Sequence, residues 1–254
     1  MTQAEIAQQF ADLHVKGDPL ILYNIWDAGS ANAVIAAGAK AVATGSWSVA
    51  AAQGYGDGQK LPLDLLLTVV GQITRVSSVP VSVDFEGAYG IEPDACAENV
   101  TKLMDTGAIG LNFEDQVVGG EGLHSVTEQV ARITAVRQAG DRFGVPLVIN
   151  ARTDLFLKEQ DPAKHTALMD ETMERAAAYR EAGATSFFAP GLNDPDLIAA
   201  LCAQIDLPVN VMKGPSTPEI STLASLGVGR VSFGPGPFRL AMKQLEEEAR
   251  NALG

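Results

Sequence analysis

Eight short apolar or β-branched runs alternate with stretches of helical character, and this alternation restricts the fold more than any other feature of the chain. The runs are Leu20–Asn24, Ala41–Thr44, Pro80–Asp84, Ile109–Phe113, Pro146–Asn150, Thr185–Ala189, Pro208–Met212 and Arg230–Gly234. Strands that alternate with helices, without long polar linkers, form parallel βα units. Eight such units favour a closed α/β barrel, a (β/α)8 barrel of the TIM type, over an open doubly wound sheet.

The predicted helices fill the intervals between these strands. They are Ser30–Ala37, Leu63–Val76, Ala95–Thr106, Val126–Gln138, Leu168–Glu181, Asp196–Ala203, Pro218–Leu226 and a final helix at Pro237–Leu253. Several end at an Ala-Gly, Thr-Gly or Leu-Gly pair, as helices commonly do. A further short helix, Gln3–Val15, is expected to close the bottom of the barrel. Because no second domain is visible, residues 1–254 are predicted to form one barrel domain.

Composition and charge exclude several classes of partner. No apolar run approaches the length of a membrane span, and the N-terminal residues do not resemble a signal peptide. The formal net charge of −13 disfavours binding to nucleic acid and to anionic membranes. Cys96 and Cys202 lack zinc-like spacing, so we expect free thiols in a cytoplasmic protein.

Four acidic residues lie where apolar runs end or in the loops that follow. Asp57 lies among glycines, Asp84 and Glu86 close one predicted strand, and Glu114 follows the next. The ends of parallel strands meet at one face of a barrel, where ligands bind, so these carboxylates are expected to converge. Asp84 and Glu86, two residues apart, are expected to point to one face of their strand. Oxygen ligands without histidine or cysteine suit Mg²⁺, so the sequence predicts a divalent-metal site.

Other polar residues at strand ends have two open interpretations each. Arg152 either contacts an anionic substrate or pairs with a neighbouring carboxylate, Asp154 or Glu114. Asp115 is expected to face away from Glu114, as a second-layer or a structural residue. Asp27 is expected to cap the helix that begins near Ser30 rather than to bind substrate.

Taken in order, the strand-end segments resemble the isocitrate lyase and phosphoenolpyruvate mutase superfamily over nearly the whole chain. The similar segments are Asn24–Ala31, Thr44–Trp47, Asp84–Gly90, Phe113–Val117, Asn150–Asp154, Pro208–Asn210, Leu226–Val228 and Pro237–Met242. The last two resemble the methylisocitrate lyase branch. The resemblance implies an α/β barrel whose C-terminal helix is swapped between subunits, in a homotetramer built as a dimer of dimers. It also implies Mg²⁺ or Mn²⁺ and a small 2-oxo or 2-hydroxy carboxylate substrate.

The resemblance also implies a role for individual residues. Asp84 would touch the metal, while Asp57, Glu86 and Glu114 would hold its water molecules. The substrate carboxylate would bind at Gly45, Ser46 and Trp47, and Arg152 would bridge the carboxylate and the oxo oxygen. Asn210 would face a second substrate group.

The predicted catalytic residues are Arg152, Glu114 and His124, and the predicted substrate-binding residues are Trp26, Gly45, Ser46, Trp47, Asp84, Arg152 and Asn210. Trp26 and Trp47 either bind at the mouth or only pack there.

Three departures from the family pattern narrow the range of activities expected for this chain. The cysteine that acts as general acid in the lyases falls on Gly122, although His124 coincides with the family histidine. His124 is therefore either an acid/base in a loop or a surface histidine. The glutamate that the lyases place after the sixth strand falls on Gly191. The two lysine positions of the mutases are occupied by Gln116 and Gly120.

These departures make cleavage of isocitrate or methylisocitrate, and mutase activity, unexpected. The leading hypothesis is a Mg²⁺-dependent lyase that breaks a C–C bond in a small 2-oxo or 2-hydroxy carboxylate through an enolate, similar to an oxaloacetate decarboxylase. One alternative is hydrolysis of a P–C bond in a phosphonopyruvate-like compound. A second alternative is a non-catalytic oligomeric protein that binds a metabolite, because fold alone does not establish activity.

Overall fold

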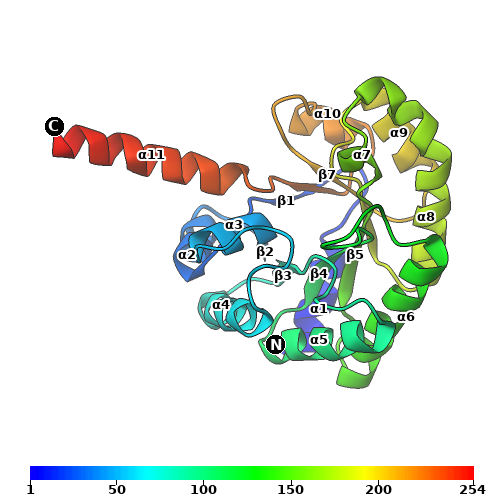
Figure 1. Cartoon of the computed structure of the whole chain (residues 1–254), viewed down its shortest axis with the longest axis horizontal. Coiled ribbons are helices and arrows are strands. Elements are labelled where there is room, and N and C mark those ends of the chain that lie inside the picture. Colours follow the sequence, from blue (N-terminus) through cyan, green and yellow to red (C-terminus); the bar gives the residue numbers. More distant parts are fainter.

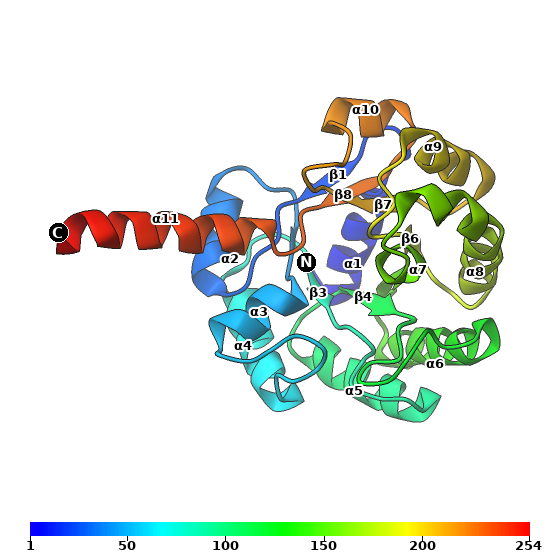
Figure 2. The ribbon, with the colours of Figure 1, turned by 45° about the horizontal axis from the view of Figure 1, so that its top comes forward.

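The computed structural model describes residues 1–254 and contains eight parallel strands arranged around a barrel (Figures 1 and 2). The strands are β1 (Leu20–Leu22), β2 (Val42–Ala43), β3 (Val81–Asp84), β4 (Gly110–Glu114), β5 (Val148–Arg152), β6 (Ser186–Phe188), β7 (Val209–Met212) and β8 (Arg230–Ser232). The hydrogen-bonded order is β1-β8-β7-β6-β5-β4-β3-β2. A single bridge between Ile25 and Thr44 joins the first and last of these strands. The predicted (β/α)8 barrel is confirmed.

Most of the helices surround the strands, whereas the first helix lies at one end of the barrel and the last projects away from it (Figure 2). The helices are α1 (Gln3–Asp12), α2 (Ala28–Ala36), α3 (Ser46–Ala52), α4 (Leu63–Val76), α5 (Pro93–Asp105), α6 (Val126–Phe143), α7 (Leu155–Lys158), the 3-10 helix η1 (Pro162–Leu168), α8 (Met169–Glu181), α9 (Pro195–Gln204), α10 (Ile220–Ser225) and α11 (Gly236–Leu253). Three of them, α3, α7 and η1, were not expected from the sequence. Helix α2 begins at Ala28, two residues before Ser30, and Asp27 caps it as predicted, accepting from the backbone N–H of Ser30.

Helix α1 closes one end of the barrel, as the sequence predicted. Its Phe10 side chain is fully buried. A Cβ built on Gly110 of β4 would lie only 3.1 Å from the Phe10 ring, so the helix sits directly against the strand. The Gln3 side chain donates to the carbonyl oxygens of Met104 and Ala108, which ties the helix to the loop before β4. Ligands can therefore reach the barrel only from the opposite end, where the strands terminate.

Helix α11 differs from the others because it projects away from the barrel (Figures 1 and 2). Only Pro237 and Phe238, at its start, are buried. Three apolar side chains further along it share one helix face, and Met242, Leu245 and Leu253 are exposed to 39%, 62% and 87%. An apolar stripe of this length does not usually remain in water. The predicted exchange of this helix between subunits remains a prediction.

None of the helices combines the length and the apolar character that crossing a membrane requires.

Candidate active site

Strand ends and the loops after them bring the four predicted carboxylates together. Asp84 is the last residue of β3, and Glu114 is the last residue of β4. Asp57 belongs to the loop after α3, and the nearby charge of Asp84 contributes to the raised pKa of Asp57. Glu86 lies two residues beyond β3, and its carboxylate accepts from the backbone N–H of Gln59.

The expectation that Asp84 and Glu86 share one strand face is wrong. The strand ends at Asp84, and Glu86 has a left-handed backbone conformation with φ of +50°. Ala88 and Tyr89 also have positive φ angles, +59° and +53°. Such conformations are costly for residues with a side chain and persist where the surroundings enforce them, often at functional sites. A tight turn, and not strand alternation, therefore brings the two carboxylates together.

Burial and the charge of Asp84 raise the pKa of the other three carboxylates. Burial, followed by the charges of Asp84 and Asp57, raises the pKa of Glu86 to about 8. Burial also raises the pKa of Glu114, with smaller contributions from the nearby carboxylates, although Arg152 opposes the shift. The pKa of Asp57 is raised by desolvation and by Asp84, even though its side chain remains exposed. A cluster that resists ionisation in this way would be stabilised by a bound cation.

The geometry is compatible with a metal held mainly through water. No three His, Cys, Asp or Glu side chains converge closely enough to form a direct protein cage for a metal ion. Mg²⁺ keeps several water ligands and needs only one or two carboxylates in direct contact. The donor set therefore fits the predicted arrangement, in which Asp84 alone touches the ion. Both Asp84 oxygens are already oriented, one by the Ser46 backbone N–H at 3.0 Å and the other by the Asn112 amide at 3.4 Å.

Arg152, the last residue of β5, pairs with both of its predicted neighbours. Its Nε and Nη2 donate to the two oxygens of Asp154 at 2.6 and 3.1 Å, and Nη1 lies 3.0 Å from Glu114. Its guanidinium also stands over the Phe188 ring, 5.9 Å from the centroid. Burial alone would lower the pKa of Arg152, but Glu114 and Asp154 raise it, so the group stays charged. Arg152 also lines the cavity described next, so pairing and substrate contact are compatible.

A cavity of about 170 Å³ opens beside these residues. It is smaller than the clefts that hold drug-sized ligands, so it suits a compact substrate. Its lining includes six of the predicted site residues: Gly45, Ser46, Trp47, Asp57, Asp84 and Arg152. It also includes residues that sequence reasoning did not select: Asn24, Asn112, Leu157, Phe188, Pro190, Met212, Ser232, Gly234 and Pro235.

The Gly45–Trp47 segment follows β2 and forms the start of α3, with Gly45 as its N-cap. The Gly45 N–H donates to the Ile25 carbonyl oxygen, and the Ser46 N–H donates to Asp84. Both backbone N–H groups are therefore already hydrogen-bonded within the protein.

Five predicted residues do not line this cavity. Glu86 and Glu114 belong to the acidic cluster beside it, and the other three lie apart from that cluster. Trp26 packs edge-on against Phe238, with ring centroids 5.1 Å apart. Asn210 is fully buried inside the barrel, where its oxygen accepts from the Ser232 hydroxyl at 3.3 Å and its Nδ2 has no partner. His124 lines a separate hollow that also contains Arg132. Its side chain is buried, and desolvation, followed by the charge of Arg132, lowers its pKa, which favours neutral imidazole.

Asp115 has a structural role, one of the two roles left open for it. It is fully buried, and its carboxylate accepts from the Tyr179 hydroxyl at 2.8 Å, from Arg175 at 3.2 Å and from the Asp154 backbone N–H at 3.0 Å. These bonds anchor the end of β4 to α8 and fix the chain beside Arg152. Glu114 and Arg152, which are register partners on β4 and β5, are positioned by this anchor.

Comparison with known proteins identifies the class. Residues 10–253 match the family model described as phosphoenolpyruvate phosphomutase, and the chain belongs to this family. An uncharacterized protein of Mycobacterium tuberculosis is 34% identical over 241 residues, covering 95% of this chain and 87% of the relative. The 2-methylisocitrate lyase of Escherichia coli is 29% identical, covering 94% and 81% of the two chains. The relatives with described activities include lyases and a mutase, so the predicted family is confirmed.

The fold also matches solved structures. A Burkholderia cenocepacia protein provisionally named as a phosphonomutase is 46% identical, with a TM-score of 0.96. The match covers 99% of this chain and 100% of that chain. The barrel fold is therefore shared with a crystallised relative.

Proposed function

We propose that this protein is a Mg²⁺-dependent lyase that breaks a C–C bond in a small 2-oxo or 2-hydroxy carboxylate by way of an enolate. The observation that carries the proposal is the placement of Arg152 next to the four carboxylates at the mouth of a compact cavity. Enolate formation requires positive charge close to the developing oxyanion, and an acidic cluster beside a fixed guanidinium provides a place for it.

The metal would be held by Asp84, with Asp57, Glu86 and Glu114 binding its water molecules. When bound, Mg²⁺ supplies Lewis-acid stabilisation of the developing negative charge. A solved phosphonopyruvate hydrolase with the same fold is described in complex with oxalate and Mg²⁺, which supports this assignment. Mn²⁺ would serve the same donor set.

The remaining roles fall to residues of this chain. Arg152 orients the substrate carboxylate and oxo oxygen, because two of its N–H bonds remain free beyond its ion pairs. Gly45, Ser46 and Trp47 shape the opposite side of the carboxylate site. None of Trp26, Asn210 and His124 lines the cavity. They would therefore act either after a change in conformation or indirectly, by positioning the residues that line it. We propose that the protein acts in the cytoplasm.

Among the specific reactions of this class we favour decarboxylation of an oxaloacetate-like acid, because it needs no cysteine as a general acid. Hydrolysis of a P–C bond remains the second candidate, since it uses the same metal and 2-oxo carboxylate. Both are tested by assaying a panel of 2-oxo, 2-hydroxy and phosphono acids with Mg²⁺ and following pyruvate release. If no member of the panel reacts while oxalate still binds, the protein is a binding protein and the lyase proposal fails.

We predict that the wild-type protein does not cleave isocitrate or methylisocitrate at a useful rate. Gly122 and Gly191 occupy the positions of the lyase cysteine and glutamate, and loss of a general acid slows such reactions by about 10²–10⁴-fold. Robust glyoxylate or pyruvate release from these substrates would contradict the assignment.

Restoring the two lyase side chains is not expected to restore the activity. Gly191 has a φ of +91°, and a Cβ there would lie 2.8 Å from the Phe156 carbonyl oxygen in α7. Gly191→Glu should therefore destabilise the protein by about 1–3 kcal/mol or more, measured by chemical denaturation. Gly122 also has a positive φ, +74°, but no atom lies within 4 Å of its Cβ position, so Gly122→Cys carries only the backbone strain and serves as the comparison without a clash.

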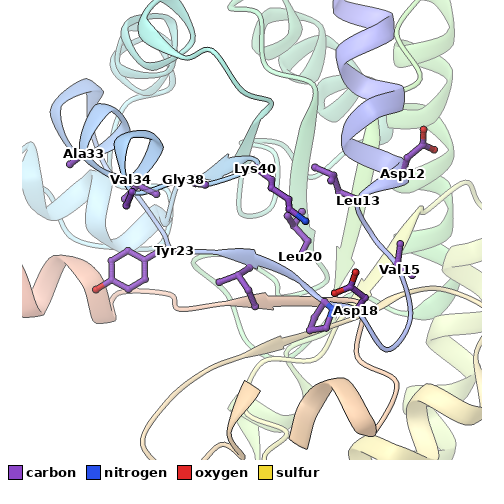
Figure 3. Close-up of a pocket in the computed structure, with 14 residues that line it drawn as sticks. Asp12, Leu13, Val15, Asp18, Leu20, Tyr23, Ala33, Val34, Gly38 and Lys40 are labelled. Carbon is purple, nitrogen blue, oxygen red and sulfur yellow. The ribbon is translucent and has the colours of Figure 1, made fainter. Parts of the chain in front are cut away.

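We also propose that the C-terminal helix is exchanged between subunits of a homotetramer. A hollow of about 610 Å³ lies over the outside of β1 and beside α2, away from the site (Figure 3). Of its 14 lining residues 9 are hydrophobic, among them Leu20, Ile21, Tyr23 and Val34. In a barrel this position is normally covered by a helix, but α11 points away from its own barrel. The apolar stripe on α11 of a second copy is a suitable cover.

This assembly predicts that Leu245→Glu disrupts the oligomer without unfolding the barrel. Leu245 is 62% exposed, so the isolated subunit loses no contact, whereas a partner groove would have to bury a charge. Light scattering should report four times the 26.6 kDa chain mass for the wild type and a smaller species for the variant. Gln244→Glu, which adds the same charge on the same helix, is the control. A wild-type monomer at micromolar concentration would contradict the proposal.

A further inference from the structure

The cavity beside the acidic residues has two chemically different sides. Asp57 and Asp84 lie on the side formed by the loop after α3 and the end of β3. The other side, here called the apolar wall, comes from α7 and from the chain at the ends of β6 and β7. It consists of Leu157, Phe188, Pro190 and Met212. In the barrel, β3 and β7 lie far apart in the strand order, so the two sides face each other across the cavity.

Arg152 is the only Lys, Arg or His that lines the cavity, and its guanidinium stands over the Phe188 ring of the apolar wall. It is already held in two ion pairs, and the proposed function assigns its two free N–H groups to the substrate carboxylate and oxo oxygen, so no cation remains for a distal charged group. Lys213 follows Met212 in sequence, but its ammonium group turns toward its own loop and lies 3.3 Å from Glu219. Arg239 stacks on Trp47 at 4.6 Å without lining the cavity. A carboxylate or phosphonate against this wall would lose its hydration without gaining a partner.

We propose that the apolar wall determines specificity, and that the fragment released from the substrate is uncharged as it leaves. This proposal rests on the proposed function, which places the substrate carboxylate and oxo group at the acidic side. The part of the substrate beyond the breaking bond then lies against the wall. A neutral fragment, such as CO₂ or an aldehyde, is accepted there, whereas phosphate or a carboxylate-bearing fragment is not.

The chemistry of an oxaloacetate-like acid agrees with such a wall. The C3–C4 bond breaks, its electron pair stays with C3 in the enolate, and C4 leaves as CO₂. A proton from solvent then adds to C3, so the products are pyruvate and CO₂. The distal carboxylate loses its charge as the bond breaks, and an apolar surround favours that change more than it favours the charged ground state. Hydrolysis of phosphonopyruvate would instead leave a phosphate dianion at the same wall.

The test compares three ligands by calorimetry in the presence of Mg²⁺. Oxalate has no distal group and reports only on the metal and carboxylate site. 2-Oxobutyrate and phosphonopyruvate share a 2-oxo acid head and differ in a distal methyl or phosphonate group. We expect 2-oxobutyrate to bind at least about tenfold more tightly than phosphonopyruvate, because the wall cannot compensate the buried charge.

A charge introduced at the wall should reverse this order. Met212 packs against Gly234, whose Cβ position lies 2.7 Å from the Met212 sulfur, and an unbranched lysine follows the same path. With Met212→Lys, phosphonopyruvate should bind more tightly than 2-oxobutyrate, each relative to oxalate in the same variant. Met212→Leu, which keeps the wall apolar, should retain the wild-type order.

The outcomes separate this proposal from the one on which it rests. If oxalate does not bind the wild type with Mg²⁺, the proposed function fails, and the wall has no substrate to select. If oxalate binds but phosphonopyruvate binds as well as 2-oxobutyrate or better, only the role of the wall is overturned. An unchanged order in Met212→Lys would likewise show that the distal group lies elsewhere.

Discussion

Replacing Asp84 with alanine is expected to abolish metal binding while leaving the barrel folded. Asp84 is the common member of the acidic cluster, because its charge raises the pKa of Asp57, Glu86 and Glu114 alike. Loss of a residue that only supports a metal site weakens binding by about 10–100-fold, so loss of the direct ligand should exceed this range. Titration calorimetry with Mn²⁺ measures the affinity, and circular dichroism measures the fold.

A matched variant separates the site from general charge effects. Asp94 is an exposed aspartate in the first turn of α5, so Asp94→Ala removes the same charge at the surface. It should retain wild-type metal affinity. Asp84→Asn keeps the shape of the side chain and should still lose the metal, because an amide lacks the negative charge. Unchanged affinity in either Asp84 variant would mean that the metal does not bind at this cluster.

The strand pattern was sufficient to predict the barrel, but not where each strand ends. The predicted strand Pro146–Asn150 is displaced from the observed β5, which extends to Arg152. Arg152 interrupts the apolar run, so its place in the strand depends on pairing with Glu114 in β4. That pairing joins residues far apart in the sequence, and no local pattern reveals it.

The acidic residues could be selected from the sequence because carboxylates at strand ends are unusual in an apolar barrel. Their mutual arrangement could not be predicted, since it depends on a left-handed backbone at Glu86 that alternation does not foresee. Phe188 and Met212 were missed for a different reason. They have the same residue types as core positions, and only the barrel register shows that they face the cavity.

Helix α7 was missed because it has only four residues, too few for a helical periodicity to appear. Its position matters for function, since it supplies Leu157 to the cavity and packs its backbone against Gly191. At Gly191 the positive φ and the Phe156 backbone therefore leave no room for the lyase glutamate. Sequence comparison shows only that position 191 differs from the lyases, whereas the structure shows that the Phe156 backbone fills the space that a side chain at this position would need.

The second large effect is expected at Arg152, where stability and activity depend on the same side chain. Glu114 and Asp154 are 3% and 1% exposed, and Arg152 is the cation that pairs with both. Arg152→Ala would leave two buried carboxylates unpaired, and breaking a buried pair typically destabilises a protein by about 3–5 kcal/mol. Chemical denaturation should report this loss. Arg180→Ala, which removes a half-exposed arginine paired with exposed acids, should change stability by less than about 1 kcal/mol.

Arg152→Lys separates the two functions of the residue. Lysine preserves the positive charge, so much of the stability should return. A single ammonium group cannot span both oxygens of Asp154, reach Glu114 and still present N–H groups to a substrate. Turnover of the best substrate from the panel should therefore fall by about 100-fold or more, the range seen when one positioned donor to an oxyanion is removed. A variant that folds like the wild type and also turns over at the wild-type rate would show that Arg152 is only a structural partner of the two carboxylates, and that the charge opposing the enolate comes from elsewhere in the site.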